Sequence, residues 1–167
     1  MKSLREVEGK PECRDYLQSS YFVSIDPETW REAVEIQGDS KDVFQTAYQI
    51  MEHVYLNFEY CPTTTSVDTQ ASEVLKNRKG VCQDFSHAVI AMCRCLGIPA
   101  RYISGYFYDS TRNQSMRGAG ASHAWVEVLV SLIKTMKSPL TLIDFFQNCQ
   151  IFFTKLINIE SIHRPFG

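Results

Sequence analysis

The sequence predicts an α+β fold in which helices pack on an antiparallel sheet. Two stretches, residues 43–58 and 85–96, place apolar residues three and four positions apart, which is the pattern of amphipathic helices. Two others, residues 100–108 and 122–130, are rich in aromatic and β-branched residues, as strands are. A chain of 167 residues is long enough for one domain with a core of its own.

Composition and charge exclude several classes of protein. Hydrophobic residues make up 44% of the chain and charged residues 22%, which is typical of soluble globular proteins. The formal net charge is -2 and the basic residues are scattered, so we expect neither nucleic acid nor a membrane as a partner. Residues 1–8 mix charges and lack the apolar run of a signal peptide, so we expect a cytoplasmic protein.

The first part of the chain, residues 1–40, is expected to be an N-terminal lead-in or linker. Within it, Asp26-Pro27-Glu28 suits a turn or the start of a helix. The core is expected over residues 41–130, and it begins with a helix whose apolar residues share one face. These residues are Val43, Phe44, Ala47, Ile50, Met51, Val54 and Phe58.

One further predicted helix ends just before Cys82, and another begins there. Thr69 is expected to cap a short helix that Gly80 ends. The apolar residues from Phe85 to Leu96 then predict a buried helix that stops before Pro99. Cys82 therefore lies at the start of a buried helix.

The strands follow that helix. Residues 100–108 predict one strand, and a polar, glycine-bearing loop is expected over residues 109–121. In residues 122–130, His123 and Trp125 alternate with small or aliphatic residues, so the two sets would face opposite sides of a strand. This alternation predicts a strand at a sheet surface, and His123 opens it.

The last segment, residues 131–167, diverges in character from the rest and contains no tyrosine or tryptophan. Its apolar residues between Leu142 and Ile157 follow helical spacing, which predicts a helix that packs in the core or binds a partner. Polar side chains interrupt this stretch, whereas a membrane span needs about 20 apolar residues in succession.

The six cysteines show no regular spacing and no Cys-x-x-Cys pair, so we expect reduced thiols with neither a metal site nor a cofactor. Apart from Cys82, each is expected to be a small buried hydrophobic residue. These residues are Cys13, Cys61, Cys93, Cys95 and Cys149.

Cys82 is the candidate nucleophile because a helix start favours the thiolate and offers backbone N–H groups to an oxyanion. A thiol nucleophile also needs a base, and among the four histidines His123 is best placed. His87 lies five residues beyond Cys82 on the same helix, about 500° of turn away, so it is expected to point away from the sulfur.

Three motifs surround these residues and resemble, in the right order, the core motifs of bacterial transglutaminase-like proteins. They are residues 80–87 (GVCQDFSH), 96–106 (LGIPARYISGY) and 122–128 (SHAWVEV). The similarity covers about residues 40–129, and residues 16–25 resemble the linker that follows an N-terminal β-domain in larger relatives. The resemblance implies a papain-like transglutaminase core and a Cys/His/Asp triad, with Cys82 as the nucleophile and His123 as the base.

The third triad position departs from the family's pattern. The family continues with a glycine-tryptophan hairpin and a Phe-Asp-Pro-like motif, whereas this chain offers only Leu142-Ile143-Asp144-Phe145. Asp144 is thus the candidate to orient His123, but a helix over 142–157 would keep it off the strand that presents the family's aspartate. Either Asp144 completes the triad or the triad is impaired.

The resemblance implies a cysteine hydrolase or transamidase that acts on peptide or protein amides through a Cys82 thioester. The alternative is a catalytically inactive domain that binds peptides or proteins. Tyr60 is expected to be a core aromatic, with a role in substrate or oxyanion binding as its alternative. Gln83 and Asp84 are expected to cap the helix start and to take no part in the chemistry.

Overall fold

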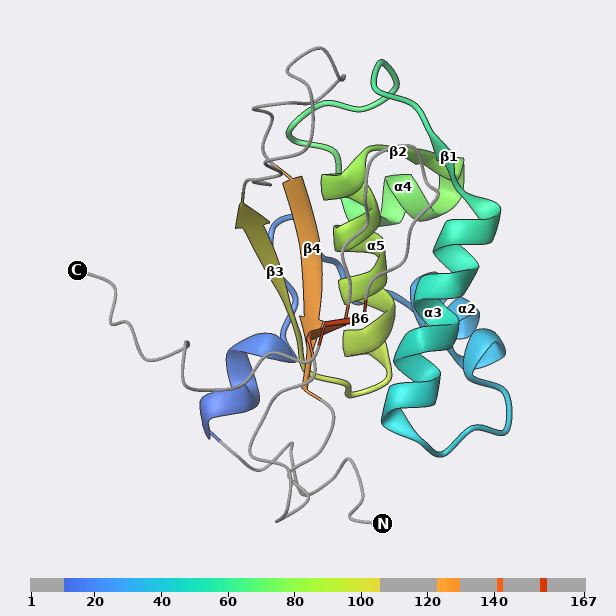
Figure 1. Ribbon diagram of the computed structural model, residues 1–167, viewed down its shortest axis with the longest axis vertical. Helices are drawn as coiled ribbons and strands as arrows, with labels where there is room; N and C mark the ends of the chain where they lie inside the picture. The colour runs from blue at the N-terminus through green and yellow to red at the C-terminus, as the bar shows by residue number, and fades with distance from the viewer. Residues whose placement is uncertain (1–10, 106–122, 130–140, 143–153, 156–167) are drawn as a thin grey trace, which may run out of the picture.

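The computed structural model describes residues 11–105, 123–129, 141–142 and 154–155 (Figure 1). The helices are η1 (Pro11–Tyr16), α2 (Pro27–Gln37), α3 (Val43–Asn57), α4 (Ala71–Asn77) and α5 (Cys82–Cys95). The strands are β1 (Glu59–Tyr60), β2 (Lys79–Gly80), β3 (Ala100–Gly105), β4 (His123–Val128), β5 (Thr141–Leu142) and β6 (Thr154–Lys155). In the described ranges, every helix is too short or too polar to span a lipid bilayer.

Helix α5 is the central element. Helices α2, α3 and α4 and strands β3 and β4 all contact it, and Figure 1 shows the strand pair on the side of α5 opposite α3. Every residue from Asp84 to Cys93 is buried, as in a helix that is covered on all sides. The predicted buried helix after Cys82 is therefore confirmed, and so is the α+β architecture.

Helix α2 begins where the sequence predicts a turn or a helix start. The Asp26 carboxylate accepts hydrogen bonds from the backbone N–H groups of Glu28, at 3.0 Å, and Thr29, at 2.9 Å. The helix buries Thr29 and Ala33 and contacts both α3 and α5. The expected lead-in, residues 1–40, thus contributes a helix to the same core.

Helix α3 confirms the helix expected after residue 40. The Asp42 carboxylate caps it by accepting a hydrogen bond from the Gln45 backbone N–H at 2.8 Å. One face of the helix is buried against α5, which the periodicity of the apolar residues predicts. The buried residues of that face are Thr46, Ala47, Ile50, Met51 and Val54.

Helix α4 is present as predicted, but both of its predicted ends are wrong. Its N-cap is Gln70, since the Thr69 hydroxyl instead accepts a hydrogen bond from the Ser66 backbone N–H at 2.9 Å. It ends before Arg78, whose backbone is left-handed with φ 56°. Gly80 lies beyond this end, in β2.

Tertiary contacts account for the left-handed backbone of Arg78, which is unfavourable for a residue other than glycine. The Arg78 guanidinium forms an ion pair with Glu32 of α2 and lies over the Phe58 ring, 4.9 Å from its centre. Its carbonyl accepts a hydrogen bond from the Glu59 backbone N–H at 2.8 Å. These partners come from other elements, so local sequence does not reveal them.

Strands β3 and β4 form the predicted antiparallel pair. Their register runs from Ala100 opposite Val128 to Gly105 opposite His123. Arg101 and Glu127, which lie directly opposite each other, form an ion pair with an N–O distance of 2.5 Å. His123 is therefore the first residue of its strand, as the sequence predicts.

The helix predicted over residues 142–157 is wrong wherever the structure describes that segment. Thr141–Leu142 and Thr154–Lys155 are extended and pair with each other in antiparallel register. The spacing of apolar residues does not reveal this pairing, because strand pairing joins residues that are many positions apart in the chain. Asp144 lies outside the described residues.

Candidate active site

Cys82 is the first residue of α5, and its side chain is half-buried. The preceding residue, Val81, is extended, with φ -118° and ψ -177°. The first hydrogen bond of the helix runs from the Phe85 backbone N–H to the Val81 carbonyl at 3.0 Å. The backbone N–H groups of Cys82 and Gln83 thus precede the helical hydrogen bonds and lie at the positive end of the helix dipole.

Asp84 holds the turn that leads into Cys82. Its carboxylate is buried and accepts hydrogen bonds from the Val81 backbone N–H, at 2.8 Å, and from the Thr65 hydroxyl, at 2.6 Å. A Cβ atom added to Gly80 would lie 2.7 Å from the Asp84 Cβ, so this position requires glycine. The capping role expected of Asp84 is confirmed.

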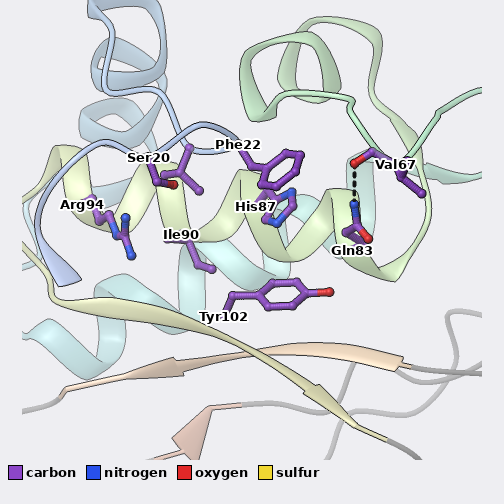
Figure 2. A pocket seen from close by; sticks show the side chains of 9 residues that line it. Ser20, Phe22, Val67, Gln83, His87, Ile90, Arg94 and Tyr102 are labelled. Atoms are coloured by element: carbon purple, nitrogen blue, oxygen red, sulfur yellow. Dashed lines mark hydrogen bonds between the residues drawn. The ribbon is translucent and has the colours of Figure 1, made fainter. Parts of the chain in front are cut away.

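Gln83 does not cap the helix with its side chain as expected. Its Nε2 atom donates a hydrogen bond to the Val67 carbonyl at 3.2 Å, drawn as a dashed line in Figure 2. The side chain therefore ties the start of α5 to the loop before α4. A capping prediction from residue type alone does not distinguish these two partners.

His123 is half-buried at the start of β4. Strand β4 contacts α5, and Figure 1 shows that the two elements begin at the same end of the molecule. Opposite His123, Gly105 provides space for the neighbouring Trp125 ring, because a Cβ atom there would lie 2.7 Å from its Cη2 atom. The fold therefore brings the helix start of Cys82 and the strand start of His123 to one end.

Tyr102 is a residue near Cys82 that sequence reasoning did not select. Burial raises the pKa of its phenol, and the charge of Cys82 raises it further. The phenol thus stays protonated at neutral pH and can donate a hydrogen bond. In the sequence Tyr102 is one aromatic residue within a strand, and only the packing of β3 against α5 connects it with Cys82.

A cavity of about 430 Å³ opens between α5, the segment before α2, and β3 (Figure 2). Three of its walls are rings: His87 stacks on Phe22 with ring centres 5.0 Å apart, and lies 5.1 Å from Tyr102. Burial lowers the pKa of His87, although the charge of Asp84 opposes this shift, so the imidazole is neutral at neutral pH. His87 thus belongs to the cavity wall.

The other cysteines and Tyr60 were expected in the core. Cys13 and Cys93 are buried, which confirms the expectation for both. Cys95 and Cys61 are only half-buried, and Cys149 lies outside the described residues. Tyr60, at the end of β1, has 47% of its surface exposed, so its expected burial is wrong. Within the described ranges, no group of three His, Cys, Asp or Glu side chains could hold a metal ion.

Comparison with known proteins places these features in a family. Residues 31–136 match the model of the transglutaminase-like superfamily. A proposed cysteine protease from Cytophaga hutchinsonii has a similar structure, with a TM-score of 0.66 and 29% identity over 77% of this chain and 42% of that chain. The periplasmic domain of TgpA from Pseudomonas aeruginosa gives a TM-score of 0.53 and 25% identity over 75% of this chain and 45% of that chain.

A sequence relative, the uncharacterized protein ML0607 of Mycobacterium leprae, is 39% identical over 72 residues, which are 41% of this chain and 25% of that protein. The chain therefore matches only about a quarter of that relative's length. The structural similarity confirms the predicted papain-like core. Because the family match includes both the Cys82 and the His123 motifs and more than half of the sequence, the chain belongs to the transglutaminase-like superfamily.

Proposed function

We propose that this chain is a cysteine hydrolase or transamidase that transfers the acyl group of a peptide amide through a thioester on Cys82. The main support is the position of Cys82, half-buried at the first position of α5 beside backbone N–H groups that precede the helical hydrogen bonds. His123 opens the strand that packs along the same helix. Membership of the superfamily and likeness to a proposed cysteine protease favour the same chemistry.

In the proposed reaction, the Cys82 sulfur attacks the carbonyl carbon of the amide, and the thiol proton passes to His123. Negative charge develops on the carbonyl oxygen, and backbone N–H groups at the start of α5 donate hydrogen bonds to it. His123 then protonates the leaving amine as the C–N bond breaks, which leaves a thioester. Water or an amine attacks this thioester, releases an acid or a new amide, and restores the thiol.

This mechanism needs the two side chains close together. We expect Cys82 Sγ and a ring nitrogen of His123 to lie within about 4.5 Å in the resting protein, which allows for the loose geometry of sites without substrate. A crystal structure measures this distance directly. A separation of about twice that value would rule out His123 as the base for Cys82.

The test of the function is a mass-spectrometric search for the thioester. The full chain is incubated with a pool of blocked peptides, with and without a primary amine, and both the protein and the products are weighed. We expect an acyl adduct on Cys82, and the product masses distinguish hydrolysis from transamidation. Cys82→Ala should abolish both adduct and product, whereas Cys61→Ala, the control at a second half-buried thiol, should retain them.

Two outcomes would contradict the proposal. Turnover that survives Cys82→Ala would assign the chemistry to other residues. Peptide binding without any adduct, across the pool and over a range of pH, would instead identify a catalytically inactive binding domain.

A further inference from the structure

The cavity of about 430 Å³ lies next to the proposed nucleophile. Gln83, the residue after Cys82, forms part of its lining. Tyr102 also lines it and is near enough to Cys82 for the charge of that residue to influence the phenol. A peptide whose amide is held at Cys82 would therefore have a neighbouring side chain within reach of this cavity.

One face of α5 forms the floor of the cavity. Gln83, His87, Ile90 and Arg94 all line it, and they recur at intervals of four, three and four residues. Figure 2 shows Phe22 on one side of His87 and Tyr102 on the other. The walls are thus mainly aromatic and aliphatic, which suits the ring of a ligand side chain.

The lining offers no carboxylate for a positively charged ligand, because it contains neither Asp nor Glu. Its residues are Ser20, Phe22, Val23, Val67, Gln83, His87, Ile90, Arg94 and Tyr102. The Arg94 guanidinium already donates hydrogen bonds to the carbonyls of Ala100, at 2.9 and 3.1 Å, and Gln18, at 2.5 Å. These bonds hold two backbone segments together, so Arg94 has a structural role at the far end of the cavity.

His87 has a polar group that the described part of the chain does not satisfy. Only 5% of its surface is exposed, and its Nδ1 atom is buried without a hydrogen-bond partner. A buried polar atom without a partner costs stability, so folding alone does not explain a histidine at this position. Because His87 lines the cavity, a rotation of its neutral imidazole would present this nitrogen, which is now covered, as a hydrogen-bond acceptor to a ligand there.

We propose that this cavity is a substrate pocket for an aromatic side chain that carries a hydrogen-bond donor, of which tyrosine is the natural example. The ring packs against Phe22 and Tyr102, and the hydroxyl donates its hydrogen bond to the His87 imidazole. The proposal rests on the proposed function, because it names the side chain that accompanies the amide attacked by Cys82.

The experiment measures peptide binding to the Cys82→Ala protein, in which no reaction can occur. The probes are blocked pentapeptides of alanine with one tyrosine, phenylalanine or lysine, placed at each position in turn. We expect the best tyrosine peptide to bind about tenfold tighter than its phenylalanine counterpart, the value of one added hydrogen bond. Lysine peptides should not bind measurably.

Two further variants, made in the Cys82→Ala background, locate the binding. His87→Phe keeps a ring in the stack but removes the nitrogen, so it should abolish the preference for tyrosine and leave phenylalanine binding unchanged. Phe22→Ala removes a wall and should weaken both peptides about tenfold. The matched control is Trp30→Ala, an aromatic of α2 with 49% of its surface exposed that does not line the cavity, and it should change neither affinity.

Equal binding of tyrosine and phenylalanine peptides would overturn the pocket assignment, and this comparison does not depend on the folding of any pocket variant. A tyrosine preference that His87→Phe leaves intact would overturn it as well. Failure of the proposed function would look different from failure of the pocket assignment. It would appear as selective binding of tyrosine peptides without any thioester on Cys82 in the unmodified protein.

Discussion

Cys82 differs from the other described cysteines in its surroundings. Burial raises the pKa of Cys93 to about 12 and that of Cys95 to about 11, so both thiols are protonated at neutral pH. Hydrogen bonds from Thr64 and Thr63 lower the pKa of Cys61. Cys82 is half-buried at the first position of α5, the positive end of the helix dipole.

We predict that iodoacetamide alkylates Cys82 first near neutral pH and Cys61 second, with Cys93 and Cys95 slower by about tenfold or more. His123→Ala should slow the reaction of Cys82, because the base proposed to accept the thiol proton is then missing. Peptide mapping over time measures each rate. Faster labelling of Cys61 together with no effect of the histidine change would count against the assignment of the pair.

Gly80 gives a second prediction for single residues. A methyl group there would collide with the Asp84 carboxylate, so Gly80→Ala should destabilise the fold by about 1–3 kcal/mol and slow alkylation of Cys82. Gly38→Ala is the control: its φ is 52° but nothing lies within 4 Å, so it should cost about 1 kcal/mol and leave alkylation unchanged. Urea unfolding and the alkylation rate are the two measurements. Equal alkylation rates in both variants would show that Asp84 does not position the turn.

Among the elements, the helix starts at Asp26 and Asp42 could be found from the sequence, whereas the ends of α4 could not. Asp26 and Asp42 act on backbone groups two or three residues away, so their role is local. The end of α4 at Arg78 depends on Glu32 and Phe58, which belong to other parts of the chain. A helix boundary can be predicted from the sequence when the groups that stabilise it lie close to it in the chain.

The cap of α2 gives a pH-dependent prediction. Burial alone would raise the pKa of Asp26, but hydrogen bonds from Thr29, Ser24 and the Glu28 backbone outweigh it, so the pKa is lowered from 3.8. Its contribution to stability is therefore complete above the unfolded pKa and is lost as the pH falls through the folded pKa. Asp26→Ala should cost about 1 kcal/mol at pH 7 and progressively less below about pH 4.

Asp26→Asn is the matched control, because asparagine caps helices about as well but does not titrate in this range. It should keep most of the stability at pH 7. Urea unfolding of the three proteins between pH 3 and pH 7 measures the effect. A cost of Asp26→Ala that is the same at both ends of this range would contradict the role given to the ionised carboxylate.

At the scale of the whole molecule, the strands that follow α5 determine where a third triad residue could lie. Strand β4 contacts both α5 and β5, and β5 ends at Leu142, two residues before Asp144. In the family that this chain belongs to, the resemblance implies an aspartate on the strand after the histidine strand. The predicted helix that would keep Asp144 off such a strand does not begin at Leu142, so Asp144 stays the candidate third member.

We predict that Asp144→Asn lowers turnover by up to about 10⁴-fold without loss of folding, since a triad histidine without its carboxylate takes the wrong tautomer. Asp68→Asn, a change at an exposed loop residue, is the control and should retain full turnover. Initial rates with the best peptide substrate provide the measurement. Full activity of Asp144→Asn would show that another group, or none, orients His123.

The sequence by itself determined the buried helix after Cys82, the strand that His123 opens, and the family, because periodicity and motifs are local properties of the chain. It did not determine the left-handed end of α4, the extended pairing of β5 with β6, or the exposure of Tyr60. Nor did it reveal the cavity, whose ring walls come from three segments: Phe22, His87 and Tyr102. Only the tertiary structure decided these features, because each depends on contacts between residues far apart in the chain, where local spacing carries no information.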